Sequence, residues 1–442
     1  MPQTAKKDAP GGTVPTISRD ELKRRFLTAW NRFEWLMGGV RQDDEALGCQ
    51  PHPFRNELKF YYGHTAAFYI QKLRLAGVLE DGVESFDDEL ERGVSPDSPE
   101  EIEALQDWPD AETLRAYRAD VRETVLGAIE GLAAAEPLQR GTAAWALAMG
   151  IEHENIHLHT SIPLIRQLDP ECKRVPDGWP RRPRSTSGHG AGWLPVPGGT
   201  LRFGIEPGRE RGFHWDNELG VRVERVEDFE VARGPVTNRE FLEFVRDGGY
   251  GDRALWTTHE AGVYLDTMQP EMPLAWIRPG GGEYRYRDVF AVRDMDWDAP
   301  VEVNRHEASA YANWAGCELV SEARYHALLR RFFAVPADLE PRGGEFDIGF
   351  GGPGRAADGD RPDAVGNVAL WAADDFQPLD PEGFVPDPFY EDFSAPWFGP
   401  QTGLLLGASY AACGHLAEVG VMRDFMQNHM DQPAGILLTR SR

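Results

Sequence analysis

The sequence predicts an α+β protein of two domains, a four-helix bundle followed by an irregular domain of short helices and strands. Residues 18–169 carry apolar side chains at three- and four-residue spacing over long stretches, which indicates amphipathic helices. Residues 170–192 are rich in proline, arginine, glycine and serine, which is typical of a linker. Over residues 193–442, glycine, proline and tryptophan are frequent and strand-like runs are short, which favours a loop-rich α+β domain.

The charge of the chain limits its partners. Its 442 residues carry a formal net charge of -26, and such a surface repels nucleic-acid phosphates and anionic lipids. We therefore expect an enzyme acting on small molecules, without a nucleic-acid or membrane partner. The four cysteines form no CxxC pair, which fits a reduced, cytoplasmic protein. Residues 1–17 lack an apolar core after their two lysines, and we expect a disordered lead-in there rather than a signal peptide.

The first domain contains four stretches with the helical period. They are residues 17–40, with Ser18 as the expected N-cap, 57–79, 110–134 and 139–168. A long acidic connection separates the second from the third, as in a bundle with one extended crossing.

The second domain is expected to begin with strands in residues 193–204 and 220–237 and to contain short helices in 238–248 and 304–316. The aromatic, proline-bearing stretch from about 371 to 400 is predicted to be a loop, and loops of that length in compact domains are usually functional.

A cluster of histidines stands near the end of the bundle, in the stretch IEHENIHLH at residues 151–159. On a helix, His153 and His157 share one face and can bind one divalent ion, whereas His159 points elsewhere and is expected at the surface. The pattern HExxH also occurs in zinc proteases, with the position of Glu154 as the base, but no third ligand follows at a familiar spacing. Two histidines on an ordinary helix surface are the simpler alternative.

His64 lies on another predicted helix, in FYYGHTAAFYI, and a bundle can gather ligands from different helices into one site. Three imidazoles leave up to three coordination positions open. A closed structural zinc site would use four protein ligands, whereas an open, imidazole-only site suits Fe(II) holding substrate and O₂. A di-iron carboxylate site needs a second Glu-x-x-His on a bundle helix, which the sequence lacks.

The stretches FYYGHTAAFYIQKL and MGIEHENIHLHTS resemble the DinB-like half of the non-haem iron sulfoxide synthases. The second half resembles the C-type-lectin-like, formylglycine-generating-enzyme-like domain of the same family, in WLPVPGGTLRFG, in the tract from Phe213 to Tyr250, in the tract from Pro300 to Tyr325 and in GNVALW. The resemblance runs from about residue 20 to 440. It implies an enzyme that uses Fe(II) and O₂, with His64, His153 and His157 as iron ligands.

Within that family, YYGHTAAFYIQKLRLAGVL, IEHENIHLHTSIPLIRQ and YEDFSAPWF look more like the ovothiol-pathway 5-histidylcysteine sulfoxide synthase. That enzyme joins cysteine to the imidazole ring of histidine. Apolar Ile156 stands where ergothioneine-type enzymes often carry a glutamine facing the substrate amine. The ovothiol type commonly carries a C-terminal methyltransferase domain, so a chain ending at 442 is expected to be a stand-alone synthase or a truncated form.

The resemblance also implies a tyrosine that supplies a proton. It corresponds to Tyr390 in PFYEDF, with Tyr410 as the second candidate, and a buried core tyrosine is the alternative for both. Trp371, Trp397 and Phe398 are candidate walls of a substrate pocket between the two domains, with core packing as the alternative.

Three motifs depart from the family pattern: GNVALW has Leu370 in place of glutamate, the usual Gly-Gly-Ser is Gly407-Ala408-Ser409, and the closing Gly-Phe-Arg-Leu is Gly-Ile-Leu-Leu. In relatives, that arginine or its neighbours help bind a substrate carboxylate. Arg423 or Arg440 are candidates to replace it, with solvated surface charge as the alternative. The donor is then cysteine, another thiol or a selenosugar.

Three other functions stay open from the residues. An ergothioneine-type or selenoneine synthase would act on a methylated histidine. A zinc hydrolase or thiol transferase would share the bundle and the three histidines. A sugar- or peptide-binding module built on the second domain would need no metal. The sequence does not determine the oligomeric state.

Overall fold

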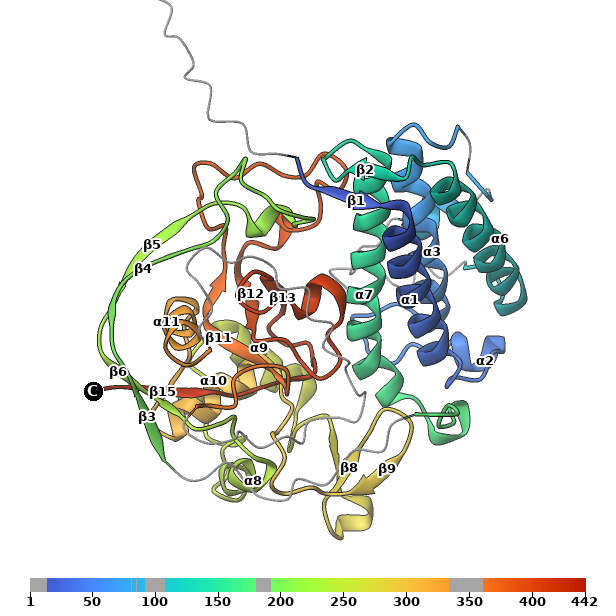
Figure 1. Cartoon of the computed structure of the whole chain (residues 1–442). Helices are drawn as coiled ribbons and strands as arrows, with labels where there is room; N and C mark the ends of the chain where they lie inside the picture. The colour runs from blue at the N-terminus through green and yellow to red at the C-terminus, as the bar shows by residue number, and fades with distance from the viewer. Residues whose placement is uncertain (1–13, 81, 85, 92–107, 180–191, 334–360) are drawn as a thin grey trace, which may run out of the picture.

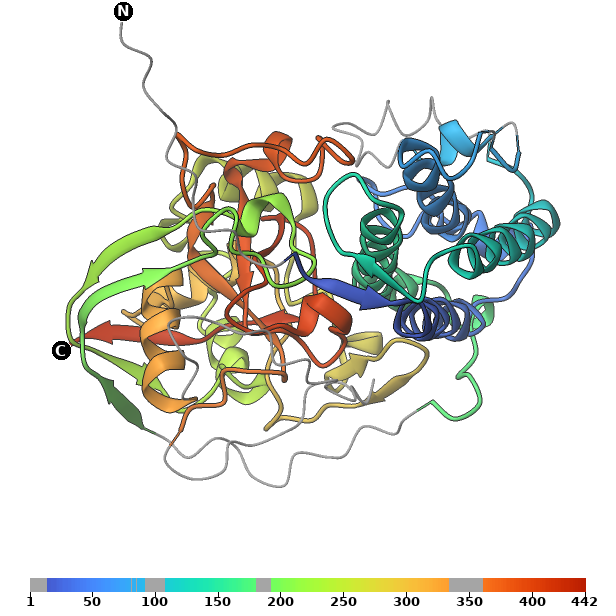
Figure 2. The ribbon, with the colours of Figure 1, turned by 45° about the horizontal axis from the view of Figure 1, so that its top comes forward.

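The computed structural model describes residues 14–80, 82–84, 86–91, 108–179, 192–333 and 361–442. The bundle and the second domain lie side by side, joined through the segment that follows α7 (Figures 1 and 2). Among the described residues, no helix is both long enough and apolar enough to cross a membrane.

Four long helices form the first domain, as predicted. They are α1 (Arg19–Met37), α3 (Leu58–Leu75), α6 (Ala111–Glu130) and α7 (Ala143–Gln167), with the short helices α2 (Asp44–Leu47) and α4 (Asp87–Glu91) between them. Ser18 caps α1, since its hydroxyl accepts the backbone N–H of Glu21 at 3.1 Å, which satisfies one of the unpaired donors at the helix start. Helix α7 continues through Pro163, as the single helical stretch predicted for 139–168 requires.

The bundle core is aromatic and extends beyond the bundle. Phe26 of α1 meets Tyr69 of α3 edge-on, with ring centroids 5.3 Å apart. The same continuous core contains Phe213, Trp215 and Phe393 of the second domain. Burial of apolar surface therefore stabilises the two domains against each other as well as the bundle itself.

The predicted ends of the first domain need correction. Residues 1–13 of the predicted lead-in lie outside the described residues, but β1 (Thr16–Ser18) pairs antiparallel with β2 (Ala135–Pro137). In the predicted linker, a 3₁₀ turn spans Pro170–Cys172 and the buried Trp179 packs on Trp35, with ring centroids 4.9 Å apart. The chain therefore stays attached to the bundle up to Trp179, and residues 180–191 lie outside the description.

The second domain is built from small sheets and short helices. Its strands are β3 (Trp193–Val196), β4 (Gly199–Phe203), β5 (Arg222–Val226), β6 (Phe229–Ala232), β7 (Trp276–Ile277), β8 (Arg285–Arg287), β9 (Val292–Asp294), β10 (Glu318–Leu319), β11 (Ala369–Phe376), β12 (Gly399–Leu406), β13 (Asp424–Gln427), β14 (Ala434–Gly435) and β15 (Leu438–Ser441). Its helices are α8 (Asn238–Arg246), α9 (His259–Met268), α10 (Arg305–Trp314) and α11 (Glu322–Phe332).

Two four-stranded sheets organise this domain, in the orders β10-β15-β6-β3 and β13-β12-β11-β14. Because the C-terminal β15 pairs with β6 near the domain's start, the two ends of the domain are tied together. The loop predicted for 371–400 is shorter than expected, since Ala369–Phe376 and Gly399–Leu406 are paired strands. The remaining connection crosses to the bundle and carries Tyr390.

Candidate metal centre

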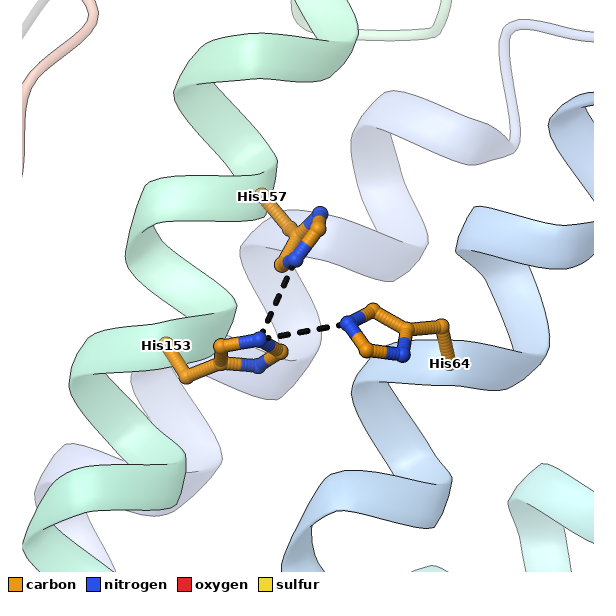
Figure 3. Close-up of side chains that lie close together, drawn as sticks. All are labelled: His64, His153 and His157. Carbon is orange, nitrogen blue, oxygen red and sulfur yellow. Dashed lines mark hydrogen bonds between the residues drawn. The ribbon is translucent and has the colours of Figure 1, made fainter. Parts of the chain in front are cut away.

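Three histidine side chains meet between α3 and α7 (Figure 3). His64 points from α3, and His153 and His157 point from successive turns of α7. The Nε2 atoms of His64 and His153 lie 3.2 Å apart, and those of His153 and His157 also lie 3.2 Å apart. Zn–N(His) distances are about 2.0–2.1 Å, and two such ligands at 90–110° would be separated by roughly 2.8–3.4 Å. The spacing therefore fits one shared ion.

The surroundings of His153 and His157 favour their neutral form. His64 and His153 are buried, and the Phe68 ring stacks on His153 with centroids 3.6 Å apart. Burial, followed by the effect of the other histidines and of Lys72 or Arg55, lowers the pKa of His153 and of His157 well below the ordinary value. A neutral imidazole is the form that binds a metal, so no proton has to be displaced.

One ligand has a fixed orientation. The Nδ1 atom of His64 lies 2.6 Å from the carbonyl oxygen of Leu90, which can accept only if Nδ1 carries the hydrogen. Nε2 then directs its lone pair toward the other two histidines. In metal sites, the tautomer of a histidine ligand is commonly fixed in this way by a hydrogen bond from its other ring nitrogen. An all-imidazole donor set suits iron, zinc, copper or nickel, so the residues fit the predicted iron without excluding the other metals.

Glu154, the residue that a zinc protease would use as base, faces away from the histidines. Its carboxylate accepts a hydrogen bond from Tyr69 at 2.9 Å and forms an ion pair with Arg118 at 3.1 Å. Burial raises the pKa of Glu154 to about 7, against the effect of Arg118 and Tyr69. It ties α7 to α3 and α6, and the arrangement does not support the protease alternative.

Tyr390 reaches the histidines from the second domain. Its ring centroid lies 6.0 Å from that of His153 and 5.0 Å from that of Phe68. The ammonium of Lys72 lies 4.8 Å from the centroid of the Tyr390 ring, on the same side of the site. The loop is held in place because Trp145 of α7 donates to Asp387 at 3.2 Å.

Tyr410 has a different environment. It is buried, its hydroxyl donates to Glu302 at 3.0 Å, and it accepts from Arg166 at 3.2 Å. Tyr286 shares the same carboxylate, which makes a buried network between α7 and the second domain. This network accounts for Tyr410 as an interdomain contact, and between the two candidates the geometry favours Tyr390.

The prediction that His159 is a surface residue is wrong. It is buried, and its Nε2 atom lies 2.8 Å from the Ser409 hydroxyl of the second domain. The second domain covers this face of α7, which would be exposed in an isolated bundle. Next to it, Ala408 has φ 57°, a conformation that favours glycine, and this is the position at which the family usually carries its second glycine.

The predicted wall residues lie at different places. Ile156 is half-buried against the bundle core, one residue before His157. Trp371 is fully buried in the second domain and donates to the carbonyl of Val303 at 2.8 Å, so core packing accounts for it. Trp397 and Phe398 are half-buried and pack on an apolar cluster of the second domain.

The two predicted carboxylate-binding arginines are paired within the protein. The buried Arg423 lines a 220 Å³ cavity, but its guanidinium donates to Glu322 at 2.6 and 3.1 Å and to two backbone carbonyls. It is therefore not the solvated surface charge that served as the alternative. Arg440 forms an exposed ion pair with Glu230 at 2.6 Å.

Three further residues near the site were not predicted from the sequence. The Tyr61 ring lies 6.0 Å from that of His157, and the Arg55 guanidinium carbon lies 5.0 Å from the centroid of the Tyr61 ring. His429 approaches the same segment from the second domain, with its ring 5.2 Å from that of Phe54. Arg55 and His429 stand on loops, where no periodicity marks an inward position.

A larger hollow lies on another face of α7. It measures 970 Å³ and is lined by Glu152 and Asn155 of α7, by residues of α1, and by Phe213 and His415 of the second domain. None of the three histidines lines this hollow, although Glu152 and Asn155 are their neighbours on α7.

Comparison with known proteins divides the chain as its fold does. A model of the DinB superfamily matches residues 25–161, and a model of the sulfatase-modifying factor enzyme 1-like domain matches residues 181–332. Hercynine oxygenase of Mycolicibacterium smegmatis is 30% identical over 336 residues, which is 71% of this chain and 73% of that protein. The hercynine oxygenase of Mycolicibacterium thermoresistibile is 29% identical over 435 residues, covering 92% and 91%. Ergothioneine biosynthesis protein 1 of Neurospora crassa is 28% identical over 220 residues, covering 46% and 24%.

Proposed function

This chain belongs to the sulfoxide synthase family, in which a DinB-like bundle is joined to a formylglycine-generating-enzyme-like domain, and we propose that it is an Fe(II)- and O₂-dependent enzyme of that family. Its reaction joins cysteine to the imidazole ring of histidine with oxidation of the sulfur. One C–H and one S–H bond are broken, a C–S bond forms, one oxygen atom of O₂ becomes the sulfoxide oxygen, and the other leaves as water.

The observation that carries this proposal is the meeting of three imidazole Nε2 atoms, with that of His153 lying 3.2 Å from each of the other two. Three ligands on one side of an ion leave room for co-substrates on the other. A bound Fe(II) would supply the redox chemistry for O₂ and acidify a coordinated thiol.

The protein's own contribution is position and proton supply. Helices α3 and α7 fix the three imidazoles, and bringing both substrates to one place removes the entropy cost of their encounter. Phe68 and the Tyr390 ring cover the His153 side and limit the access of water there. The Tyr390 hydroxyl is the proposed donor of a proton to the oxygen that leaves as water.

A second candidate has the same chemistry on a methylated histidine, and the names of the relatives favour it. Both Mycolicibacterium relatives are called hercynine oxygenase, and hercynine is not the histidine on which an ovothiol-type enzyme acts. Ile156 favours the ovothiol-type substrate instead, because ergothioneine-type enzymes often carry a glutamine at this position. A selenosugar donor is the further variant.

Product analysis separates these candidates. The protein is loaded with Fe(II) without oxygen and then exposed to O₂ with histidine, dimethylhistidine or trimethylhistidine. Each is combined with cysteine, γ-glutamylcysteine or a selenosugar, and mass spectrometry identifies the adduct. We expect a histidine–cysteine sulfoxide. A protein that couples only trimethylhistidine would contradict the ovothiol-type assignment. A zinc-loaded protein that acts as a hydrolase without O₂ would contradict the proposed oxidative coupling reaction.

A further inference from the structure

The charge of Arg55 is unusual among the buried arginines of this protein. Five described arginines are buried: Arg55, Arg118, Arg166, Arg305 and Arg423. Four of them have a carboxylate partner: Arg118 pairs with Glu154, Arg166 with Glu302, Arg305 with Asp375 and Arg423 with Glu322.

Arg55 has no such partner within the described residues. It is only 6% exposed, its Nε donates to the Tyr61 hydroxyl at 2.8 Å, and its guanidinium lies over the Tyr61 ring. The nearby Glu57 pairs with Lys59 instead, at 3.1 Å. A buried charge without a counter-charge is unfavourable for folding. The chain has 72 acidic residues, yet none of those described is paired with Arg55.

The position of Arg55 links it to the metal centre. Tyr61 lies between them, since its ring meets the Arg55 guanidinium on one side and is 6.0 Å from the His157 ring. Lys72 stands at the opposite end, over the rings of Phe68 and Tyr390. The Arg55 end is therefore separate from the end that carries the proposed proton donor.

Besides the Glu57 oxygen that is paired with Lys59, two buried atoms of residues near Arg55 make no hydrogen bond within the described residues. The Oδ1 atom of Asn56 is buried without a hydrogen bond, as is Nε2 of His429 from the second domain. An amino acid carries both an anionic carboxylate and a cationic ammonium group. Arg55 and His429 can donate to the first, and the Asn56 oxygen can accept from the second.

We propose that Arg55 binds the α-carboxylate of an amino-acid co-substrate at the three-histidine centre, and so takes the place considered for Arg423 and Arg440. The inference rests on the proposed function. Both histidine and cysteine carry the required group, and a guanidinium binds it through paired hydrogen bonds that an ammonium cannot reproduce.

Binding to the Fe(II)-loaded protein without oxygen tests this directly. Calorimetry gives the Kd of histidine against histamine and of cysteine against cysteamine, which differ only in the carboxylate. The variants are Arg55→Gln and Arg55→Lys, with Arg440→Gln as a control that also removes one arginine charge. Metal content and thermal unfolding are measured for each.

We expect the wild type to prefer the carboxylate-bearing member of one pair, and Arg55→Gln to lose about tenfold to hundredfold of that preference. The pair that loses it identifies the co-substrate. Arg55→Lys should keep part of the preference, and Arg440→Gln all of it.

Equal preferences in the wild type and in folded Arg55→Gln would overturn the inference. If Arg55→Gln does not fold, a wild type that distinguishes neither pair overturns it as well. A protein that takes up no Fe(II) fails the proposed function, whereas one that takes up Fe(II) and forms the adduct, yet binds both members of each pair equally, fails only the Arg55 inference.

Discussion

Among the described residues, two clusters that contain histidines offer ligand atoms within 4.8 Å of one another, but their charges differ. The first contains three imidazoles, His64, His153 and His157, without a carboxylate. The second places Glu218 between His214, at 3.2 Å, and His415, at 2.7 Å.

The carboxylate changes the state of its neighbours. Burial alone would lower the pKa of His415, but Glu218 and Glu418 raise it well above the ordinary value. Burial alone would raise the pKa of Glu218, but His415 and His214 lower it. The second cluster is therefore an ion pair that already satisfies its own charges, and the backbone N–H of His415 also donates to Glu152 of α7, at 2.8 Å. Proximity of ligating groups alone does not indicate a metal site; neutral, converging lone pairs do.

Removing one imidazole of the first cluster should have the largest effect on catalysis. His153→Ala leaves two ligands, so we expect metal affinity to fall by more than about hundredfold, beyond the loss that follows removal of an outer partner. Sulfoxide formation should disappear with it. Metal analysis after dialysis measures the first effect, and His415→Gln is the matched control. A His153→Ala protein that keeps full metal content would show that the clusters had been assigned wrongly.

Tyr390→Phe should have the next largest effect while leaving the metal bound. Loss of a positioned proton donor costs about 10² or more in rate, and we expect the residual activity to shift from coupling toward oxidation of the thiol alone. Mass spectrometry measures the ratio of the two products. Tyr410→Phe is the control. If only Tyr410→Phe changed the product ratio, Tyr410 rather than Tyr390 would be the proton donor.

His415→Gln should change stability rather than chemistry. It leaves the Glu218 carboxylate without its cationic partner, and breaking a buried pair costs about 3–5 kcal/mol. Urea unfolding should show the loss, whereas the Fe(II) content stays at the wild-type level. A variant as stable as the wild type would mean that the second cluster is not a charged pair.

The contribution of this pair should also depend on pH. The raised pKa of His415 adds stability fully below its ordinary pKa of 6.5, and this is lost as the pH rises through the folded value. The lowered pKa of Glu218 adds stability above its ordinary 4.5, lost as the pH falls through the folded value. The difference in thermal midpoint between wild type and His415→Gln should therefore be largest from about 4.5 to 6.5 and shrink on both sides. A difference independent of pH would contradict the assigned charges.

The sequence predicted the bundle and its centre because both depend on helical period. His153 and His157 are one turn apart, and a bundle turns such positions toward the inward face of a neighbouring helix, where His64 lies. Contacts between side chains far apart in the chain were not predictable in this way. The burial of His159 depends on Ser409, and the pairing of Arg423 depends on Glu322, 101 residues away in the chain. Arg55 stands out only in the structure, because it is buried and no carboxylate of the described residues pairs with it.

The identity of the ligands to bound iron tests the central claim most directly. X-ray absorption on the Fe(II)-loaded protein without oxygen counts imidazole ligands, and the same measurement on His153→Ala and His415→Gln locates them. We predict three imidazoles in the wild type and in His415→Gln, with the site lost in His153→Ala. Iron bound by two imidazoles and a carboxylate, kept in His153→Ala and lost in His415→Gln, would place the metal in the other cluster and contradict the proposed centre.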